Sequence, residues 1–179
     1  TRPVSLWELE NRRDLYSESV TTLPTPLKLL KKSGVCSIDI PESLFAIDFP
    51  NQYFRRIRDV RIEVVAPKFK GHYLNAQLSL IDNKLDLKGL QKFVENRIGT
   101  QTLATSTAHQ EVGKFDFRFS SEKFSPFEGA GAISTWTLSI NGFDNTYSTS
   151  LSHTDFLKDI DDVIIHVSYT ARMGKTQAQ

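Results

Sequence analysis

The chain has 179 residues, a length typical of one folded domain with a substantial hydrophobic core. Apolar residues make up 39% and charged residues 24%, an ordinary globular balance, and 22 basic against 21 acidic side chains give a formal net charge of +1. We therefore expect a single domain over residues 1–179 that has no nucleic-acid partner and no direct membrane contact, because both need an excess of positive charge.

The first predicted element is a short helix at residues 25–34. Thr25 can accept a hydrogen bond from a free backbone amide of the first turn, and Pro26 suits the first helical position, where no donor is needed. Gly34 can adopt the left-handed conformation that ends a helix. Residues 41–45 predict one further helical turn after a strand.

From residue 60 onward, apolar and polar residues alternate with a period of two. The alternating segments are residues 60–64, 74–80, 115–119, 136–140 and 163–169. This pattern is typical of half-buried antiparallel strands. With the alternating segment at 35–40, six or more such strands with few helices favour a β-sandwich or jelly roll. We expect two packed sheets, whose core includes Leu78, Leu80, Phe117, Trp136, Leu138, Ile165 and Val167.

Two stretches interrupt the alternation. Residues 82–112 contain a possible short helix at 86–93 and a weak strand near 102–106, and the polar residues 141–158 predict a long loop. The expected fold class is thus all-β in the main, an antiparallel sandwich with one short N-terminal helix and minor helical turns.

The sequence offers no convincing catalytic or metal site. Cys36 is the only cysteine, and its place on the apolar side of an alternating segment predicts a buried thiol. The four histidines share no metal-ligand spacing, and the acidic run at 155–162 lacks the glycine and glutamate of a calcium loop. Residues 129–132 precede a strand rather than a helix, unlike a phosphate loop. We expect no cofactor and no enzymatic activity.

Charged residues flank aromatic residues at the ends of several predicted strands. Arginine forms planar, bidentate pairs with carboxylates, so these charges predict a partly buried ion-pair lattice that fixes strand ends. Exposed surface charge is the alternative. The proposed members of the lattice are Asp48, Arg55, Arg56, Glu128 and Arg172.

Four of these segments together resemble one known family, the C-terminal domain of the A subunits of Tc-type insecticidal toxins. The segments are CSIDIPESLF at 36–45, DFPNQYFRRIRDV at 48–60, PFEGAGAISTW at 126–136 and DDVIIHVSYTAR at 161–172. The resemblance runs in order from about residue 4 to residue 174. It departs from the family pattern in turns, for example at Asn51 and Gln52, where the family has Gly-His.

The resemblance implies a β-sandwich that docks another protein and catalyses nothing. In the family, the A subunit is a pentameric pore-forming translocator of a released toxin complex, and this domain binds the B–C cocoon at the channel entrance. The implied partners are the cocoon and neighbouring A protomers. The chain begins with Thr1 rather than Met, which suggests a segment of something longer, and the resemblance implies that it is the C-terminal segment of a much larger chain.

Loops on a rigid scaffold usually carry binding residues, so we expect contact with the cocoon at loops of one sandwich end. The candidates are Pro67, Lys68, Phe69, Lys70 and His72 in one loop, and Asn141, Asp144 and Asp155 in the other. A carbohydrate-binding module is the alternative, although Trp136 alternates with the inward-facing set and Trp7 lies outside the strand core. A purely structural cap for a larger assembly is a third possibility.

Overall fold

The computed structural model describes residues 1–11, 25–69, 73–87, 92–144 and 152–174. In chain order the elements are β1 (Arg2–Ser5), α1 (Leu6–Asn11), α3 (Pro26–Ser33), β2 (Val35–Ile40), α4 (Glu42–Ala46), β3 (Gln52–Val65), β4 (Tyr73–Asp86), β5 (Phe93–Glu95), β6 (Leu103–Glu111), β7 (Lys114–Arg118), β8 (Ile133–Asp144), α5 (His153–Lys158) and β9 (Asp162–Met173).

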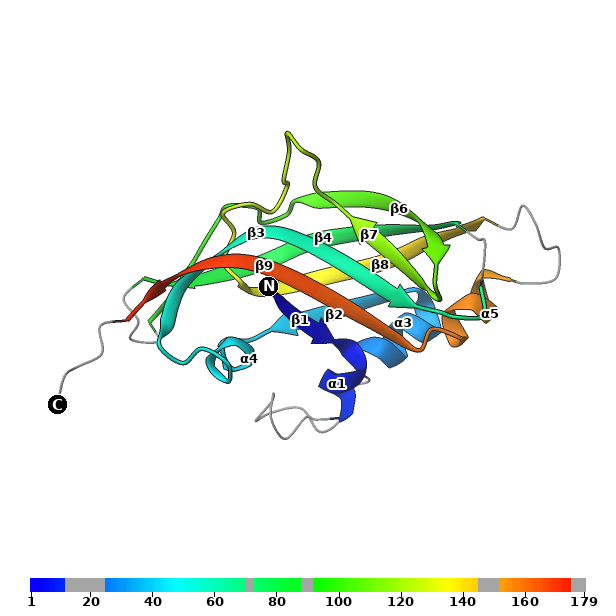
Figure 1. The fold of residues 1–179 in the computed structure, drawn as a ribbon, viewed down its shortest axis with the longest axis horizontal. Coiled ribbons are helices and arrows are strands. Elements are labelled where there is room, and N and C mark those ends of the chain that lie inside the picture. Colours follow the sequence, from blue (N-terminus) through cyan, green and yellow to red (C-terminus); the bar gives the residue numbers. More distant parts are fainter. Residues whose placement is uncertain (12–24, 70–72, 88–91, 145–151, 175–179) are drawn as a thin grey trace.

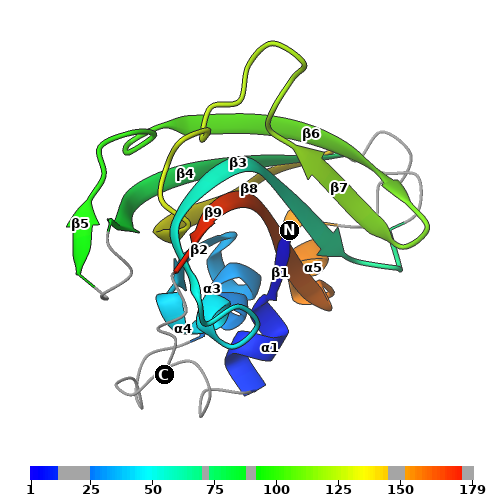
Figure 2. The same cartoon turned by 60° about the vertical axis from the view of Figure 1, so that its left-hand side comes forward.

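The strands form one antiparallel sheet in the order β1-β9-β3-β7-β6-β4-β8-β2, with β5 added to β4. Figures 1 and 2 show this sheet curled over the helices. The prediction of a mainly antiparallel all-β fold is confirmed, although the expected two sheets are the two halves of one. Strand β6 joins the halves, because Leu103–His109 pair with β4 while Gln110 and Glu111 pair with β7.

The core lies on the concave side of the sheet, where α1, α3 and α5 cover it (Figure 2). Apolar side chains that alternate along each strand point inward, and the helices contribute Leu6, Leu30 and Phe156. All seven core residues expected from the alternation are fully buried, which confirms that prediction. Cys36 is also buried, and burial raises the pKa of its thiol to about 12.

Helix α3 begins and ends as its sequence predicts. The Thr25 hydroxyl accepts a hydrogen bond from the Lys28 amide at 3.4 Å, and Pro26 occupies the first turn. At the other end Gly34 has φ +76° and donates its amide proton to the Leu30 carbonyl at 2.8 Å. The amphipathic face places Leu27 and Leu30 against the core.

The two interrupted stretches are more regular than expected. The weak strand near 102–106 is the start of the nine-residue β6. The long loop predicted at 141–158 is wrong in part, because β8 continues to Asp144 and α5 begins at His153. A reciprocal capping box starts α5: the Ser152 hydroxyl accepts from the Asp155 amide at 3.2 Å, and the Asp155 carboxylate accepts from the Ser152 amide at 3.4 Å.

The predicted helix at 86–93 falls largely outside the described residues. Asp86 ends β4, and Phe93 begins β5, while residues 88–91 are not described.

Trp136 is the largest fully buried side chain, and its loss should destabilise the fold strongly. Its ring packs edge-to-face on Phe127, 4.9 Å between centroids, and its indole N–H donates to the Ser134 hydroxyl at 2.7 Å. We expect Trp136→Ala to lower the free energy of unfolding by about 3–5 kcal/mol, because it leaves a large cavity. Urea unfolding followed by circular dichroism measures this. Thr137→Ala, on the outer face of the same strand, should change it by less than about 0.5 kcal/mol.

Candidate functional site

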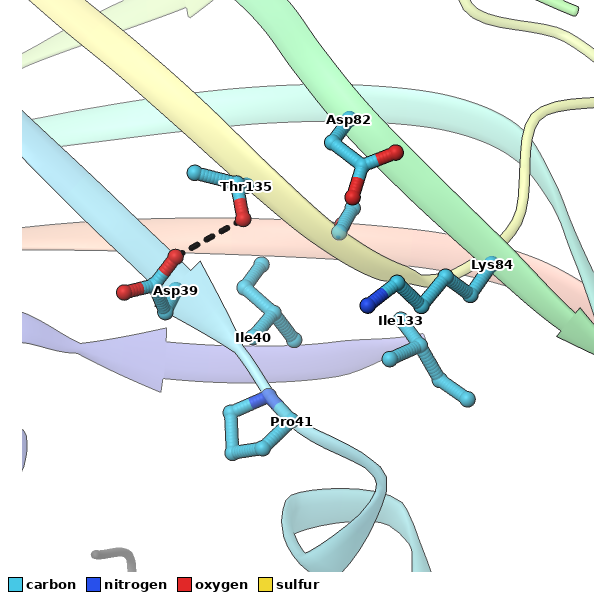
Figure 3. Close-up of a pocket in the computed structure, with 8 residues that line it drawn as sticks. Asp39, Ile40, Pro41, Asp82, Lys84, Ile133 and Thr135 are labelled. Atoms are coloured by element: carbon cyan, nitrogen blue, oxygen red, sulfur yellow. Dashed lines mark hydrogen bonds between the residues drawn. The ribbon is translucent and has the colours of Figure 1, made fainter. Parts of the chain in front are cut away.

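The described residues carry no constellation typical of catalysis or metal binding. No group of three or more His, Cys, Asp or Glu side chains among them is placed to hold a metal ion, and no helix among them is long and apolar enough to cross a membrane. A shallow hollow of about 120 Å³ lies where β2, β4 and β8 meet (Figure 3). Asp39, Asp82 and Lys84 line it, and the Thr135 hydroxyl there is bonded to Asp39 at 2.8 Å.

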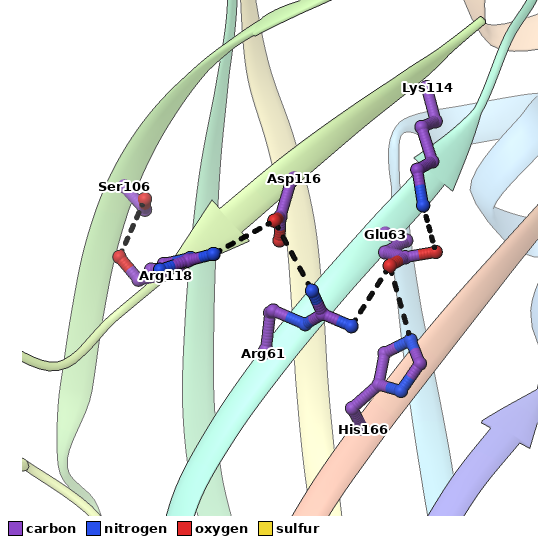
Figure 4. A network of polar contacts seen from close by, with 7 residues as sticks. All are labelled: Arg61, Glu63, Ser106, Lys114, Asp116, Arg118 and His166. Atoms are coloured by element: carbon purple, nitrogen blue, oxygen red, sulfur yellow. Dashed lines mark hydrogen bonds and ion pairs between the residues drawn. The ribbon is translucent and has the colours of Figure 1, made fainter. Parts of the chain in front are cut away.

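A network of charged side chains lies across β7, β3 and β9 (Figure 4). Its centre is Glu63, which is only 7% exposed. The carboxylate of Glu63 lies 3.0 Å from an Arg61 nitrogen, 3.1 Å from Lys114 Nζ and 3.5 Å from His166 Nε2. Asp116 lies 3.3 Å from Arg61 and extends the network along β7. The basic and acidic side chains balance one another's charge. The network therefore serves to stabilise the pairing of β7, β3 and β9.

The network changes the proton affinity of two of its members. Burial alone would raise the pKa of Glu63, but the hydrogen bond and charge of Lys114, with His166 and Arg61, hold that pKa below its ordinary value. Burial, followed by the nearby charge of Arg61, lowers the pKa of His166 despite the attraction of Glu63. The folded protein therefore favours neutral imidazole beside ionised carboxylate.

The lowered pKa of His166 should make stability depend on pH. In the unfolded chain His166 takes up a proton near its ordinary pKa of 6.5, whereas the folded chain resists it, so the free energy of unfolding falls as the pH drops below that value. We expect His166→Gln to flatten this decline between about pH 7 and pH 5. Urea midpoints across that range measure it, and an equally steep decline in the variant would contradict the assignment.

Arg55 lies buried at the start of β3, with a side chain only 2% exposed. Its guanidinium pairs with Glu42 of α4, donates to the Phe49 carbonyl at 2.9 Å and lies 5.4 Å from the centre of the Phe45 ring. Burial raises the pKa of Glu42, although the hydrogen bond and charge of Arg55 oppose that rise. Asp48, expected in the same lattice, pairs instead with Arg2.

Arg56 and Arg172 gather around an aromatic ring rather than a carboxylate. Their guanidinium carbons lie 5.9 Å and 4.5 Å from the centre of the Phe54 ring, and Arg56 Nε donates to the Gly129 carbonyl at 3.3 Å. Phe54 sits at a bulge, where the register between β3 and β9 shifts, and has φ +52°. Glu128 is exposed and forms no ion pair with any described residue, so the pairing expected of it does not form.

The ion pair of Arg55 should stabilise the fold far more than Glu128 does. Removing one partner of a buried pair costs about 3–5 kcal/mol, because a buried charge is left uncompensated. Since Glu42 is partly exposed, we expect Glu42→Gln to lower the free energy of unfolding by about 2–3 kcal/mol. The matched variant Glu128→Gln should cost less than about 0.5 kcal/mol. Equal effects in chemical denaturation would contradict this account.

Of the loop residues expected to meet a partner, those that the structure describes lie at the opposite end of the sheet. Pro67 and Lys68 are exposed, and Lys68 Nζ lies 3.4 Å from Asp159. Phe69 is buried, with its ring 4.9 Å from that of Phe156, so it serves the core rather than a surface.

The remaining candidates of that set have varied settings. Asn141 is exposed on β8, and the backbone of Asp144 at the end of β8 pairs with Tyr73. Asp155 belongs to α5, where the hydrogen bonds from Ser152 lower its pKa. Lys70 and His72 lie outside the described residues.

The four sequence segments quoted above converge at the Arg55 end of the sheet. The Ala132 amide donates to the Arg55 carbonyl at 3.0 Å, and the Ile57 and Gly129–Ala130 backbones exchange hydrogen bonds of 2.7 and 2.9 Å. The Phe45 ring packs edge-to-face on Tyr169, 5.2 Å between centroids. One end of the sheet thus joins α4, the start of β3, the segment before β8 and the end of β9.

The model of one protein family, described as the Tc toxin complex TcA C-terminal TcB-binding domain, matches residues 18–171. The chain belongs to this family. A curated relative, Toxin subunit YenA2 of Yersinia entomophaga, is 30% identical over 171 residues, which cover 86% of this chain and 12% of that protein. The chain therefore corresponds to about an eighth of that relative's length.

A solved structure, the cryo-EM structure of Yersinia pseudotuberculosis TcaA-TcaB, has a related fold. The TM-score is 0.53 at 18% sequence identity, and the match covers 96% of this chain and 10% of the other. At this identity the likeness concerns the fold alone, and it extends over nearly the whole of this chain.

Proposed function

We propose that this chain is a non-catalytic docking domain that binds the TcB component of a Tc toxin complex at the entrance of the translocation channel. The observation that carries the proposal is the family match over residues 18–171, which includes all the strands of the sheet except β1 and the last two residues of β9. The architecture also suits docking. One continuous sheet with a packed core provides a rigid scaffold for surface contacts.

The proposal includes the assembly in which docking takes place. The chain is part of an A subunit of a released toxin complex, and five copies surround the channel so that one B–C cocoon engages all of them. Linked sites gain effective concentration, and avidity can exceed single-site affinity by a factor of about 10²–10⁴ without any new contact. A single copy is therefore expected to bind weakly.

Valency should decide the measured affinity. We expect the monomeric chain to bind the cognate B–C component weakly, and the same chain fused at its N-terminus to a pentameric coiled coil to bind at least about 100-fold more tightly. Surface plasmon resonance with immobilised B–C component measures both. A pentameric coiled coil without the chain controls for the scaffold.

Two results would count against docking. One is the absence of binding by the pentameric form at micromolar concentrations. The other is clear binding to a glycan on a glycan panel by the pentameric form when that form does not bind the B–C component. This result would favour the carbohydrate-binding alternative.

A further inference from the structure

The arginines of the described residues divide into two groups. Arg2, Arg55, Arg61 and Arg118 each pair with a carboxylate. Among the described residues, Arg56, Arg58, Arg97 and Arg172 form no ion pair with a carboxylate. All four unpaired arginines lie at the end of the sheet where the four sequence segments converge.

Contacts at the Gly129 carbonyl, one hollow and the β3–β9 pairing place these arginines at the same end of the sheet. The Gly129 carbonyl accepts from Arg56 Nε at 3.3 Å and from the side-chain amide of Asn96, the neighbour of Arg97, at 3.2 Å. Arg58 lines a hollow with Glu128 and Tyr169. Arg172 lies opposite Tyr53 in the pairing of β3 with β9.

The four arginines at this end of the sheet leave guanidinium groups without an ion-pair partner among the described residues. Of the four unpaired arginines, Arg58 is the one that lines the hollow whose carboxylates are Glu128 and Asp59. The whole chain carries a formal net charge of only +1. The unpaired guanidinium groups are therefore a local feature of this end, and they favour an acidic partner over a general polyanion.

Apolar side chains are exposed beside the arginines. Ile47 and Phe49 are 55% and 51% exposed on the segment that leads into β3, and Met173 is 68% exposed at the end of β9. Gln52 connects them, because its amide donates to the Phe49 carbonyl at 3.2 Å and it pairs with Met173 in the sheet. Aromatic residues, Met and Arg are the types enriched in protein interfaces.

Phe54 stands between the charged and apolar groups in a conformation that costs free energy. An aromatic residue at φ +52° is strained, and such strain persists where the surroundings impose it, often at binding sites. Here the bulge and the two stacked arginines hold the ring half-exposed. The stacking also orients the planar guanidinium group of Arg172. In this orientation the group can form a bidentate pair with a carboxylate of a partner.

We infer that Phe54, Arg56 and Arg172, with Phe49 and Met173 beside them, form the central contact surface for an acidic face of the TcB component. We call these five residues the bulge surface. The inference rests on the proposed function and specifies its site. It places docking at the Arg55 end of the sheet, opposite the loop that contains Pro67 and Lys68.

Two matched pairs of variants of the pentameric form test this assignment. Phe54→Asn and Val112→Asn each replace a residue of positive φ, +52° and +49°, by one that tolerates this conformation, at opposite ends of the sheet. Arg172→Glu and Lys68→Glu reverse one exposed charge at each end. All four should retain the circular dichroism spectrum, and the two Asn variants should keep or raise the melting temperature.

Binding to the immobilised TcB component should separate the pairs. We expect Phe54→Asn and Arg172→Glu to bind at least about tenfold more weakly, since truncating one central contact commonly costs this much. Val112→Asn and Lys68→Glu should bind within about twofold of the unaltered form. The loss in Arg172→Glu should shrink as salt is raised from 50 to about 500 mM, because screening weakens the charge attraction.

Three outcomes would overturn the inference. If only Val112→Asn and Lys68→Glu lose affinity, docking uses the loop end, and the proposed function stands. If all four variants bind the TcB component as the unaltered form does, the bulge surface is not the docking site. If the unaltered pentameric form itself fails to bind, the proposed function fails together with the inference.

Discussion

A buried guanidinium group holds together the end of the sheet on which the proposed function depends. Arg55 has its charge balanced by Glu42 and its face covered by Phe45, and it also binds the Phe49 carbonyl. A buried charge without a partner would be costly, so α4 and the segment that enters β3 are fixed relative to one another. The backbone carbonyl of Arg55 accepts a hydrogen bond from the Ala132 amide. This bond fixes the segment before β8 at the same end of the sheet.

This constraint explains why Phe54 is strained. Tyr53, before it, pairs with β9, and the side chain of Arg55, after it, is buried. The backbone of the bulge between them therefore has little conformational freedom. The ring consequently lies outside the core, where Arg56 and Arg172 stack on it. A stabilising contact inside the protein and an exposed aromatic ring on its surface are thus two results of the same local geometry.

Local patterns in the sequence were sufficient for much of the fold. Alternation identified the inward-facing side of β4, β7, β8, β9 and the second half of β3, and Thr25, Pro26 and Gly34 defined α3, because these signals act within a few residues of one another. The union of two sheets into one was not predictable in this way. It depends on β6 changing partners at Gln110, which is a long-range pairing without a local signature. The helix α5 did have a signal, the Ser152 and Asp155 capping box, that the polar composition of the segment concealed.

In the candidate site, too, local sequence signals identified some features, and long-range packing decided the others. The arginines stood out because they flank aromatic residues, but the sequence did not specify which carboxylate each would meet. Glu42 and Glu128 both belong to the segments that resemble the family, and only tertiary packing distinguishes the buried partner from the exposed one. Phe54 was hidden for another reason, since a bulge is set by the register between strands rather than by residue type.

The position of β9 has a consequence for biosynthesis. This strand lies between β1 and β3, so the last of the described strands completes a sheet to which the earliest described strand belongs. During translation β1 and β3 must wait for a neighbour made more than 90 residues after β3 ends, and long-range pairing of this kind is slow to form. A nascent chain interrupted before β9 leaves one edge of β3 open and β1 without a partner strand, and open edges favour aggregation. Because Arg172 arrives with β9, the bulge surface is completed only when the sheet is, and an unfinished chain cannot present it.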